Sequence, residues 1–181
     1  IDWIIDNKTF YDVVWLPDAG TNDMESHRKL KELGIKVLLT DHHDRNEETV
    51  IEDNVVLINN QTSDKYRNKE LTGAGVTWQF CKYCDEQFGT DFANKLIDLA
   101  ALGITGDMGS VLELENRYII KTGFENIQNY YFKVLCSKQS YSMGGKINPT
   151  TVAFYIVPLI NAMIRVGTPE EKERVFISFI D

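Results

Sequence analysis

The sequence predicts an α/β fold in which a parallel sheet comes first and helices follow. Two β-branched and aromatic runs, Tyr11–Pro17 and Ile35–Thr40, are typical of buried strands. The segment between them, "NDMESHRKLKELG" at 22–34, has helical spacing and ends at a glycine. A strand–helix–strand unit of this kind builds a parallel sheet with a right-handed crossover, so both strands end at the same edge of the sheet.

The remaining elements follow in order along the chain. Val55–Asn59 is a third predicted strand, and the polar loop "NQTSDKYRNKELT" comes after it. Helical spacing then predicts helices at 75–88, 91–105, 115–127, 150–166 and 169–180. The stretch "CSKQSYSMGGKINP" is the clearest loop. We therefore expect one domain over 1–137 and a connecting segment of loop and helices over 138–181.

Composition limits the classes of protein. The chain has 181 residues, of which 43% are hydrophobic and 25% charged, and no apolar run approaches the roughly 20 residues of a membrane span. The first residues lack the features of a secretory signal, and the three cysteines are sparse, so we expect a soluble, cytoplasmic protein without a membrane partner. The formal charge of −8 means that a phosphodiester substrate would need metal ions or further segments to supply positive charge.

Five residues combine into a candidate metal site. Asp18 and Asp41 end the first two predicted strands, His42 and His43 follow Asp41 directly, and Asp107 lies between two glycines where an apolar helix stops. Carboxylates and imidazoles without paired thiolates suit Mn²⁺ or Mg²⁺ better than a structural zinc ion. Taken singly, each residue could be a loop cap or an exposed turn residue. Taken together at strand ends, they favour metal-assisted hydrolysis.

Five segments form a pattern that extends from about residue 11 to residue 165. They are "LPDAG" at 16–20, "TDHH" at 40–43, "LTGAGVTWQF" at 71–80, "LGITGDMGSVLELENR" at 102–117 and "VPLINAMIR" at 157–165. In this order the segments resemble the DHH phosphoesterases, and within them the RecJ-type exonucleases specific for single-stranded DNA.

The resemblance implies a role for each candidate residue. Asp18 would bridge two metal ions, His42 and Asp107 would bind one of them, His43 would contact the phosphate or the transition state, and Asp41 would orient the histidines. Two cations about 4 Å apart activate a water and neutralise charge in an in-line displacement at phosphorus. The implied fold is a Rossmann-like parallel sheet with flanking helices, followed by a helical segment that leads toward a second domain.

The implied activity is metal-dependent exonuclease cleavage of single-stranded DNA, with 5′ to 3′ polarity. Other DHH enzymes hydrolyse short oligonucleotides or cyclic dinucleotides, and some relatives are catalytically inactive scaffolds of replication complexes, so both alternatives stay open. Single-stranded DNA is the implied partner, and a single-strand-binding protein or a helicase is a candidate protein partner.

The chain also departs from the family pattern. An earlier strand with an Asp-x-Asp motif and the glycine-rich second domain have no counterpart in the sequence. We therefore expect 1–137 to be a partial DHH domain. We also expect the chain alone to be inactive and to bind at most one divalent ion, weakly, where the complete protein would hold two.

Four more residues are candidate substrate contacts. The resemblance implies that Asn161 and Arg165 lie near the substrate groove, although they could also be two exposed polar residues one helical turn apart. Gly73 and Gly75 could aim backbone N–H groups at a phosphate, or they could only allow close packing. His27 lies on a charged helix face, where we expect it to be solvated.

Overall fold

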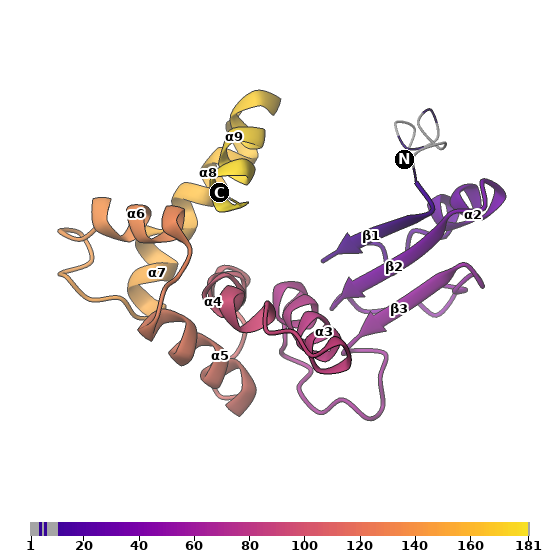
Figure 1. Ribbon diagram of the computed structural model, residues 1–181, viewed down its shortest axis with the longest axis horizontal. Coiled ribbons are helices and arrows are strands. Elements are labelled where there is room, and N and C mark those ends of the chain that lie inside the picture. Colours follow the sequence, from indigo (N-terminus) through magenta and orange to yellow (C-terminus); the bar gives the residue numbers. More distant parts are fainter. Residues whose placement is uncertain (1–3, 5, 7–10, 181) are drawn as a thin grey trace.

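The computed structural model describes residues 4, 6 and 11–180, and it confirms the predicted α/β fold. Three parallel strands, β1 (Val13–Pro17), β2 (Lys36–Asp41) and β3 (Val55–Asn59), form one sheet in the order β1-β2-β3 (Figure 1). Leu16 pairs with Leu39, and Leu39 pairs with Leu57. Because this register aligns the strands, their carboxyl ends reach the same edge, which faces the helical half of the chain (Figure 1).

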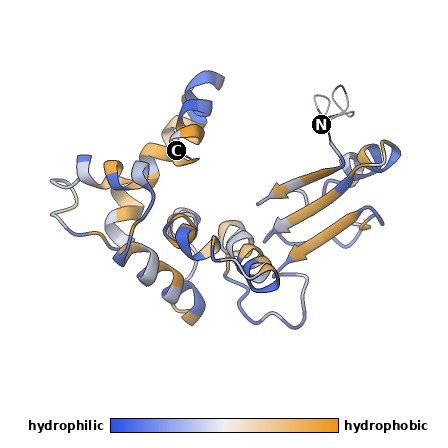
Figure 2. Cartoon of the chain, in the orientation of Figure 1, coloured by the Kyte–Doolittle hydropathy of each residue, from blue (hydrophilic) through white to orange (hydrophobic). Residues whose placement is uncertain are grey.

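Helix α2 (Met24–Glu32) covers one face of the sheet, where its Leu30 packs with Val37 and Leu39 of β2. Figure 2 shows that apolar residues dominate the three strands. The expectation that His27 is solvated was wrong: its side chain is fully buried, and neither ring nitrogen has a hydrogen-bond partner in the described part of the chain. Burial lowers the pKa of His27, although Asp23 and Glu52 act in the opposite direction.

Helix α3 (Gly73–Phe88) lies against the other face of the sheet. Trp15 Nε1 donates to Thr40 Oγ1 at 3.0 Å, and Thr40 Oγ1 lies 2.8 Å from Thr77 Oγ1. These contacts join β1, β2 and α3 just before the strands end. They therefore hold the start of α3 close to the edge where the acidic residues follow.

The rest of the chain is helical. A 3₁₀ turn (Ala93–Leu96) leads into α4, and α4 packs against α5, α7 and α8 around a second core that includes the fully buried side chains of Ile104, Ile119 and Phe132. The helices are α4 (Ile97–Gly106), α5 (Leu114–Glu125), α6 (Tyr130–Lys138), α7 (Pro149–Tyr155), α8 (Val157–Val166) and α9 (Pro169–Ile180).

Two helical predictions need correction. The single helix expected at 150–166 is divided at Ile156, because Pro158 lacks the N–H that would continue the hydrogen-bond ladder. Helix α6 was not among the predicted helices, and it takes up the first residues of the expected loop, which runs over 139–148. The domain boundary after residue 137 stays a prediction.

The stretch Pro149–Val166 is long and apolar enough, by length and composition, to cross a membrane. The sequence analysis did not anticipate this. In the structure the stretch consists of the two separate helices α7 and α8, both of which contact α4. Val157, at the start of α8, lies against Gly106 at the end of α4. Length and composition alone are therefore weak evidence for a membrane span.

Candidate metal centre

Asp18 follows β1 directly and is held in place by its backbone. Its N–H donates to the carbonyl oxygen of Thr40 at 2.8 Å. Its φ of 59° lies in the left-handed region, which residues other than glycine rarely adopt. Gly73, the first residue of α3, lies against the Asp18 carboxyl group. A Cβ atom at residue 73 would come within 2.0 Å of Asp18 Oδ1, so only glycine fits here.

His42 brings the end of β2 into contact with two carboxylates. Its Nε2 lies 3.2 Å from Asp18 Oδ1 and 3.4 Å from Asp107 Oδ2. Asp107 is the C-cap of α4, where its N–H donates to the Gly103 carbonyl, and the next residue, Met108, has a φ of 58°. The structure thus brings together three predicted metal ligands from three separate elements of the fold.

The donor atoms fit a divalent cation. One ligand atom each from Asp18, His42 and His43 can be chosen within 4.8 Å of one another. Adjacent ligands of an octahedral Mg²⁺ or Mn²⁺ ion are about 3 Å apart, close to the distances from His42 Nε2 to the two carboxylates. Burial raises the pKa of Asp18; His42 lowers it, and the nearby Asp107 carboxylate raises it further. A cation would relieve this repulsion, so the site suits a hard metal ion.

Asp41 has a different role from the other acids, because its carboxylate is buried and already fully hydrogen-bonded. Oδ1 accepts from the backbone N–H groups of His42 and His43 and contacts His43 Nδ1 at 2.7 Å. Oδ2 accepts from Thr21 N–H at 3.0 Å and Thr21 Oγ1 at 2.6 Å. Burial alone would raise the pKa of Asp41, but these hydrogen bonds outweigh it and lower the pKa to about 2.

His43 is oriented by this anion. Its Nδ1 faces Asp41 Oδ1, which leaves Nε2 free to contact a substrate, and its side chain is 58% exposed. The hydrogen bond to Asp41 raises the pKa of His43. Asp41 thus contacts the backbone of both histidines and the ring of His43, and its role in orienting them stays a prediction.

Thr21 is the residue that sequence reasoning missed. It is almost fully buried, it donates twice to Asp41, and its Oγ1 accepts a hydrogen bond from Asn59 Nδ2 at 3.1 Å. Asn59 also donates to the carbonyl oxygen of His43 at 2.9 Å. The only sequence signal was a hydroxyl residue three positions after a strand-end aspartate, and such residues are common in turns.

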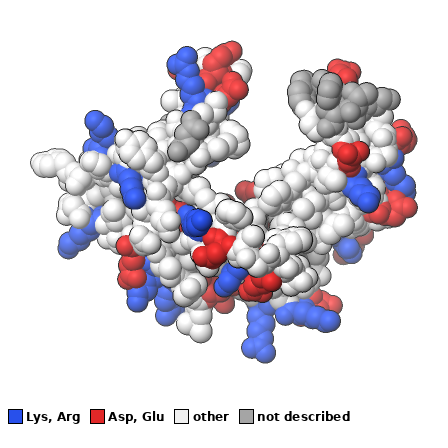
Figure 3. Space-filling model, in the orientation of Figure 1, with Lys and Arg blue, Asp and Glu red and all other residues white. Residues whose placement is uncertain are grey.

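Of the four predicted substrate contacts, Gly73 lies against the Asp18 carboxyl group of the cluster. Gly75 is buried, and a Cβ atom there would meet Leu71 and Ile104, so its environment is one of close packing. Asn161 and Arg165 are exposed on α8, and neither makes a side-chain hydrogen bond or ion pair with another described residue. Figure 3 shows the molecule hollowed between its sheet half and helices α8 and α9, with acidic and basic side chains visible at the floor.

Comparison with known proteins places this geometry in a family. The model of the DHH family, N-terminal domain, matches residues 1–104. The prophage-derived protein YorK of Bacillus subtilis, whose name proposes a single-strand DNA-specific exonuclease, is 36% identical over 169 residues, which are 93% of this chain and 29% of that protein. The single-stranded-DNA-specific exonuclease RecJ of the same organism is 30% identical over 163 residues, 89% of this chain and 20% of RecJ.

Two solved structures are similar to this chain in both fold and sequence. Exonuclease RecJ bound to manganese superposes with a TM-score of 0.79 at 28% identity, over 94% of this chain and 43% of that one. RecJ of Thermus thermophilus in complex with Mn²⁺ gives 0.83 at 26% identity, over 99% of this chain and 26% of that one. The chain spans less than a third of the length of the curated relatives it matches. By its matching domain, its relatives and the arrangement of its acids and histidines, the chain belongs to the DHH family.

Proposed function

We propose that this chain forms the metal-binding part of an exonuclease that hydrolyses the phosphodiester bonds of single-stranded DNA. The observation that carries the proposal is the convergence of Asp18 and Asp107 on His42 Nε2, beside a His43 ring fixed by a buried anion. The relatives named as single-strand-specific exonucleases and the manganese-bound RecJ structures support both the substrate and the metal. A cytoplasmic location fits DNA as the substrate.

Each side chain has a distinct task in this proposal. Asp18, His42 and Asp107 would hold the metal, and bound Mn²⁺ or Mg²⁺ would supply an activated water and neutralise charge on the phosphate. His43 offers Nε2 to a phosphate oxygen, and its raised pKa favours the protonated form that can donate there. Asp41 keeps the His43 ring in one orientation. Asn161, Arg165 and the N-terminus of α3 at Gly73 and Gly75 are the proposed contacts to the rest of the strand.

The chain by itself is proposed to be inactive and to hold at most one divalent ion, weakly. Three protein ligands leave an octahedral ion with half of its positions to water. The complete two-ion site, the polarity of cleavage and any single-strand-binding or helicase partner belong to the proposal for the larger protein.

The test measures nucleotide release from end-labelled single-stranded DNA by the protein as its natural gene encodes it. We expect Mn²⁺-dependent release from single strands, much slower release from duplex DNA, and no release by His42→Ala. A matched control is His27→Leu, which removes a histidine that does not take part in the metal site. Calorimetry on the 181-residue chain alone should show one weak Mn²⁺ site.

Three results would contradict the proposal or a part of it. A folded protein that binds single-stranded DNA but releases nothing with any divalent ion would indicate a scaffold. Rapid hydrolysis of cyclic dinucleotides or two-residue oligonucleotides, with long strands untouched, would indicate the small-substrate branch of the family. Two tight Mn²⁺ sites in the chain alone would overturn the view that it holds only part of the centre.

A further inference from the structure

Three neighbouring cavities lie along α5, and one of them is lined by residues next to Asp107 in the sequence. This cavity, of about 430 Å³, is lined by Thr105 and Met108, which lie on either side of Asp107 in the chain, and by Phe154 of α7. Thr105 is buried, and its Oγ1 has no hydrogen-bond partner among the described residues. A second cavity, of about 610 Å³, shares with the first the residues Val111, Ile120 and Pro149.

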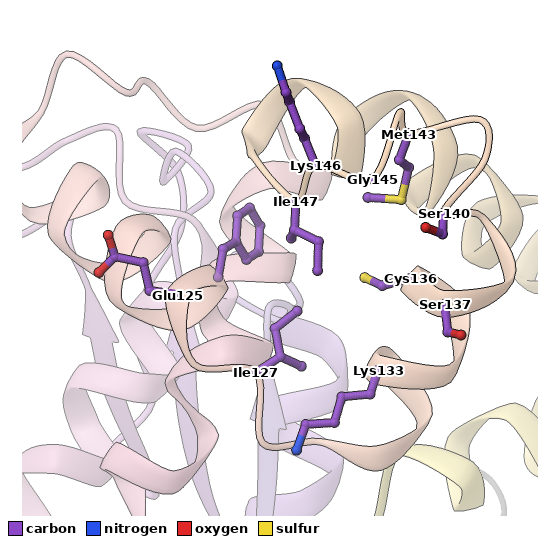
Figure 4. A pocket seen from close by; sticks show the side chains of 11 residues that line it. Glu125, Ile127, Lys133, Cys136, Ser137, Ser140, Met143, Gly145, Lys146 and Ile147 are labelled. Atoms are coloured by element: carbon purple, nitrogen blue, oxygen red, sulfur yellow. The ribbon is translucent and has the colours of Figure 1, made fainter.

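A third cavity, of about 390 Å³, continues the series between α5, α6 and the 139–148 loop. It shares Phe124, Glu125 and Ile147 with the second cavity. Figure 4 shows Lys133 and Lys146 on opposite sides of this cavity, with apolar side chains between them. The three neighbouring cavities are together named the α5 groove.

The α5 groove is cationic although the chain is acidic. Its ionised lining residues are four cations and one carboxylate, a net charge of +3 (4 − 1), against −8 for the whole chain. Arg117 is held by the carbonyl oxygens of Val111 and Leu112, and Lys121 lies 4.0 Å from Glu125. The ammonium groups of Lys133 and Lys146 have no hydrogen bond or ion pair with any described residue, so both are available to an anion.

The floor and rim of the same groove expose large apolar side chains. Met108 and Leu112 are each 80% exposed, and Phe154 is 72% exposed. Exposed apolar groups interleaved with unpaired cations are the features that bind single-stranded nucleic acid, since bases stack on the first and phosphates contact the second. An acidic peptide could use the same cations, but it would not explain why the loop that directly follows a candidate metal ligand lines the groove.

We propose that the α5 groove is the path of a single DNA strand leading away from the metal cluster, with Lys133 and Lys146 as its distal phosphate contacts. This inference rests on the proposed function, because the strand's reacting phosphate is the one placed at Asp18, His42 and Asp107. It adds a binding surface on α5, α6 and α7, separate from the candidate contacts on α8.

The test measures binding of fluorescein-labelled dT20 to the 181-residue chain by anisotropy, over a series of salt concentrations and without divalent ions. Losing two phosphate contacts should lower the salt slope of log K by about 1.4 and weaken binding about 25-fold at 0.1 M salt, as each single-strand contact accounts for roughly 0.7 counterions. We expect this for Lys133→Gln combined with Lys146→Gln. The matched control is Lys36→Gln with Lys65→Gln, two exposed lysines outside the groove.

A second variant tests the apolar part of the groove. Phe154→Ala should weaken dT20 binding about fivefold or more while leaving the salt slope unchanged, because a stacking platform is lost and no charge is removed. Lys133, Lys146 and Phe154 are all exposed, so the melting temperatures of the variants should equal that of the parent chain.

Equal dT20 affinities for the groove pair and the control pair would overturn the proposal. So would a groove pair that loses affinity only for a labelled acidic peptide rich in Asp, Leu and Phe, a result that would assign the groove to a protein partner. Because the assay needs no cleavage, it separates the two hypotheses. If dT20 binds in the groove but the natural protein hydrolyses no DNA, the proposed exonuclease function is refuted and the strand path stands. If the natural protein hydrolyses DNA and the Lys133→Gln/Lys146→Gln pair does not change this, the strand path is refuted and the exonuclease function stands.

Discussion

Replacing Gly73 by alanine tests whether the metal cluster depends on the close approach of α3 to Asp18. A Cβ atom at residue 73 would lie 2.0 Å from Asp18 Oδ1, 2.5 Å from Cγ and 2.6 Å from Cβ, where ordinary contacts are 3.4–4 Å. Rotation of the carboxylate cannot relieve the contact with Asp18 Cβ. The Asp18 backbone is fixed by its hydrogen bond to Thr40, so Asp18 Oδ1 must lose its 3.2 Å distance from His42 Nε2.

We expect Gly73→Ala to weaken Mn²⁺ binding by about 10- to 100-fold, the loss typical when a metal ligand loses its supporting contact. This corresponds to about 1.4–2.8 kcal/mol of binding free energy. The measurement is a Mn²⁺ titration of the chain followed by electron paramagnetic resonance, which also detects millimolar affinities. The matched control is Gly75→Ala, whose Cβ would meet Leu71 at 2.3 Å and Ile104 at 3.4 Å in the core but would touch no carboxylate.

An unchanged Mn²⁺ affinity in a folded Gly73→Ala protein would refute the role given to Asp18. If the Gly75 variant lost as much affinity as the Gly73 variant, the effect would come from general destabilisation. Urea unfolding of both variants distinguishes these cases, since we expect the Gly75 variant to lose more stability and the Gly73 variant to lose more affinity.

Three further predictions concern buried polar groups around the sheet. The ionised form of Asp41 stabilises the fold above its usual pKa of 3.8, and this contribution, about 2 kcal/mol for a pKa lowered to about 2, should disappear as the pH falls toward 2. The urea stabilities of the chain and of Asp41→Asn should therefore converge between pH 5 and pH 2.5, and a constant difference would contradict this. Burial lowers the pKa of His27, so below about pH 6.5 its side chain binds a proton more readily in the unfolded chain than in the folded chain. The free energy of unfolding should therefore decrease as the pH falls below about 6.5. The free energy of unfolding of His27→Leu minus that of the parent should therefore be larger at pH 5 than at pH 8. The same difference at both pH values would refute the assignment. Thr21→Val removes the hydroxyl that links Asp41 to Asn59 and should cost about 1–3 kcal/mol, while Thr21→Ser should lose much less; equal losses would show that only packing matters.

The candidate ligands could be predicted from the sequence because their positions follow from topology. In a parallel sheet with right-handed crossovers, residues after consecutive strands must meet at one edge, and this places Asp18 near His42 without any knowledge of side-chain contacts. Asp107 required more, because its approach depends on how α4 packs against α3. The family resemblance supplied that part.

Features that depend on contacts distant in sequence could not be predicted. His27 lies in a helix whose neighbours are charged, and only the packing of α2 on the sheet shows that the imidazole faces inward. Thr21 gains its role from Asp41, twenty residues later. Pro158 indicates a break between α7 and α8 at Ile156. A sequence does not show, however, whether a proline lies in the first turn of a helix or in its interior.

Among the described residues other than glycine, left-handed backbone conformations occur at Asp18, a candidate ligand, and at Met108, which follows the candidate ligand Asp107. Each conformation costs roughly 1–2 kcal/mol for a residue with a side chain, so the local chain by itself would avoid both. The geometry is therefore a cooperative property of the assembled sheet and helices. A short peptide that carries the same acids and histidines should not reproduce it. Metal uptake should disappear at the same denaturant concentration as the sheet, which makes a bound ion a reporter of global folding.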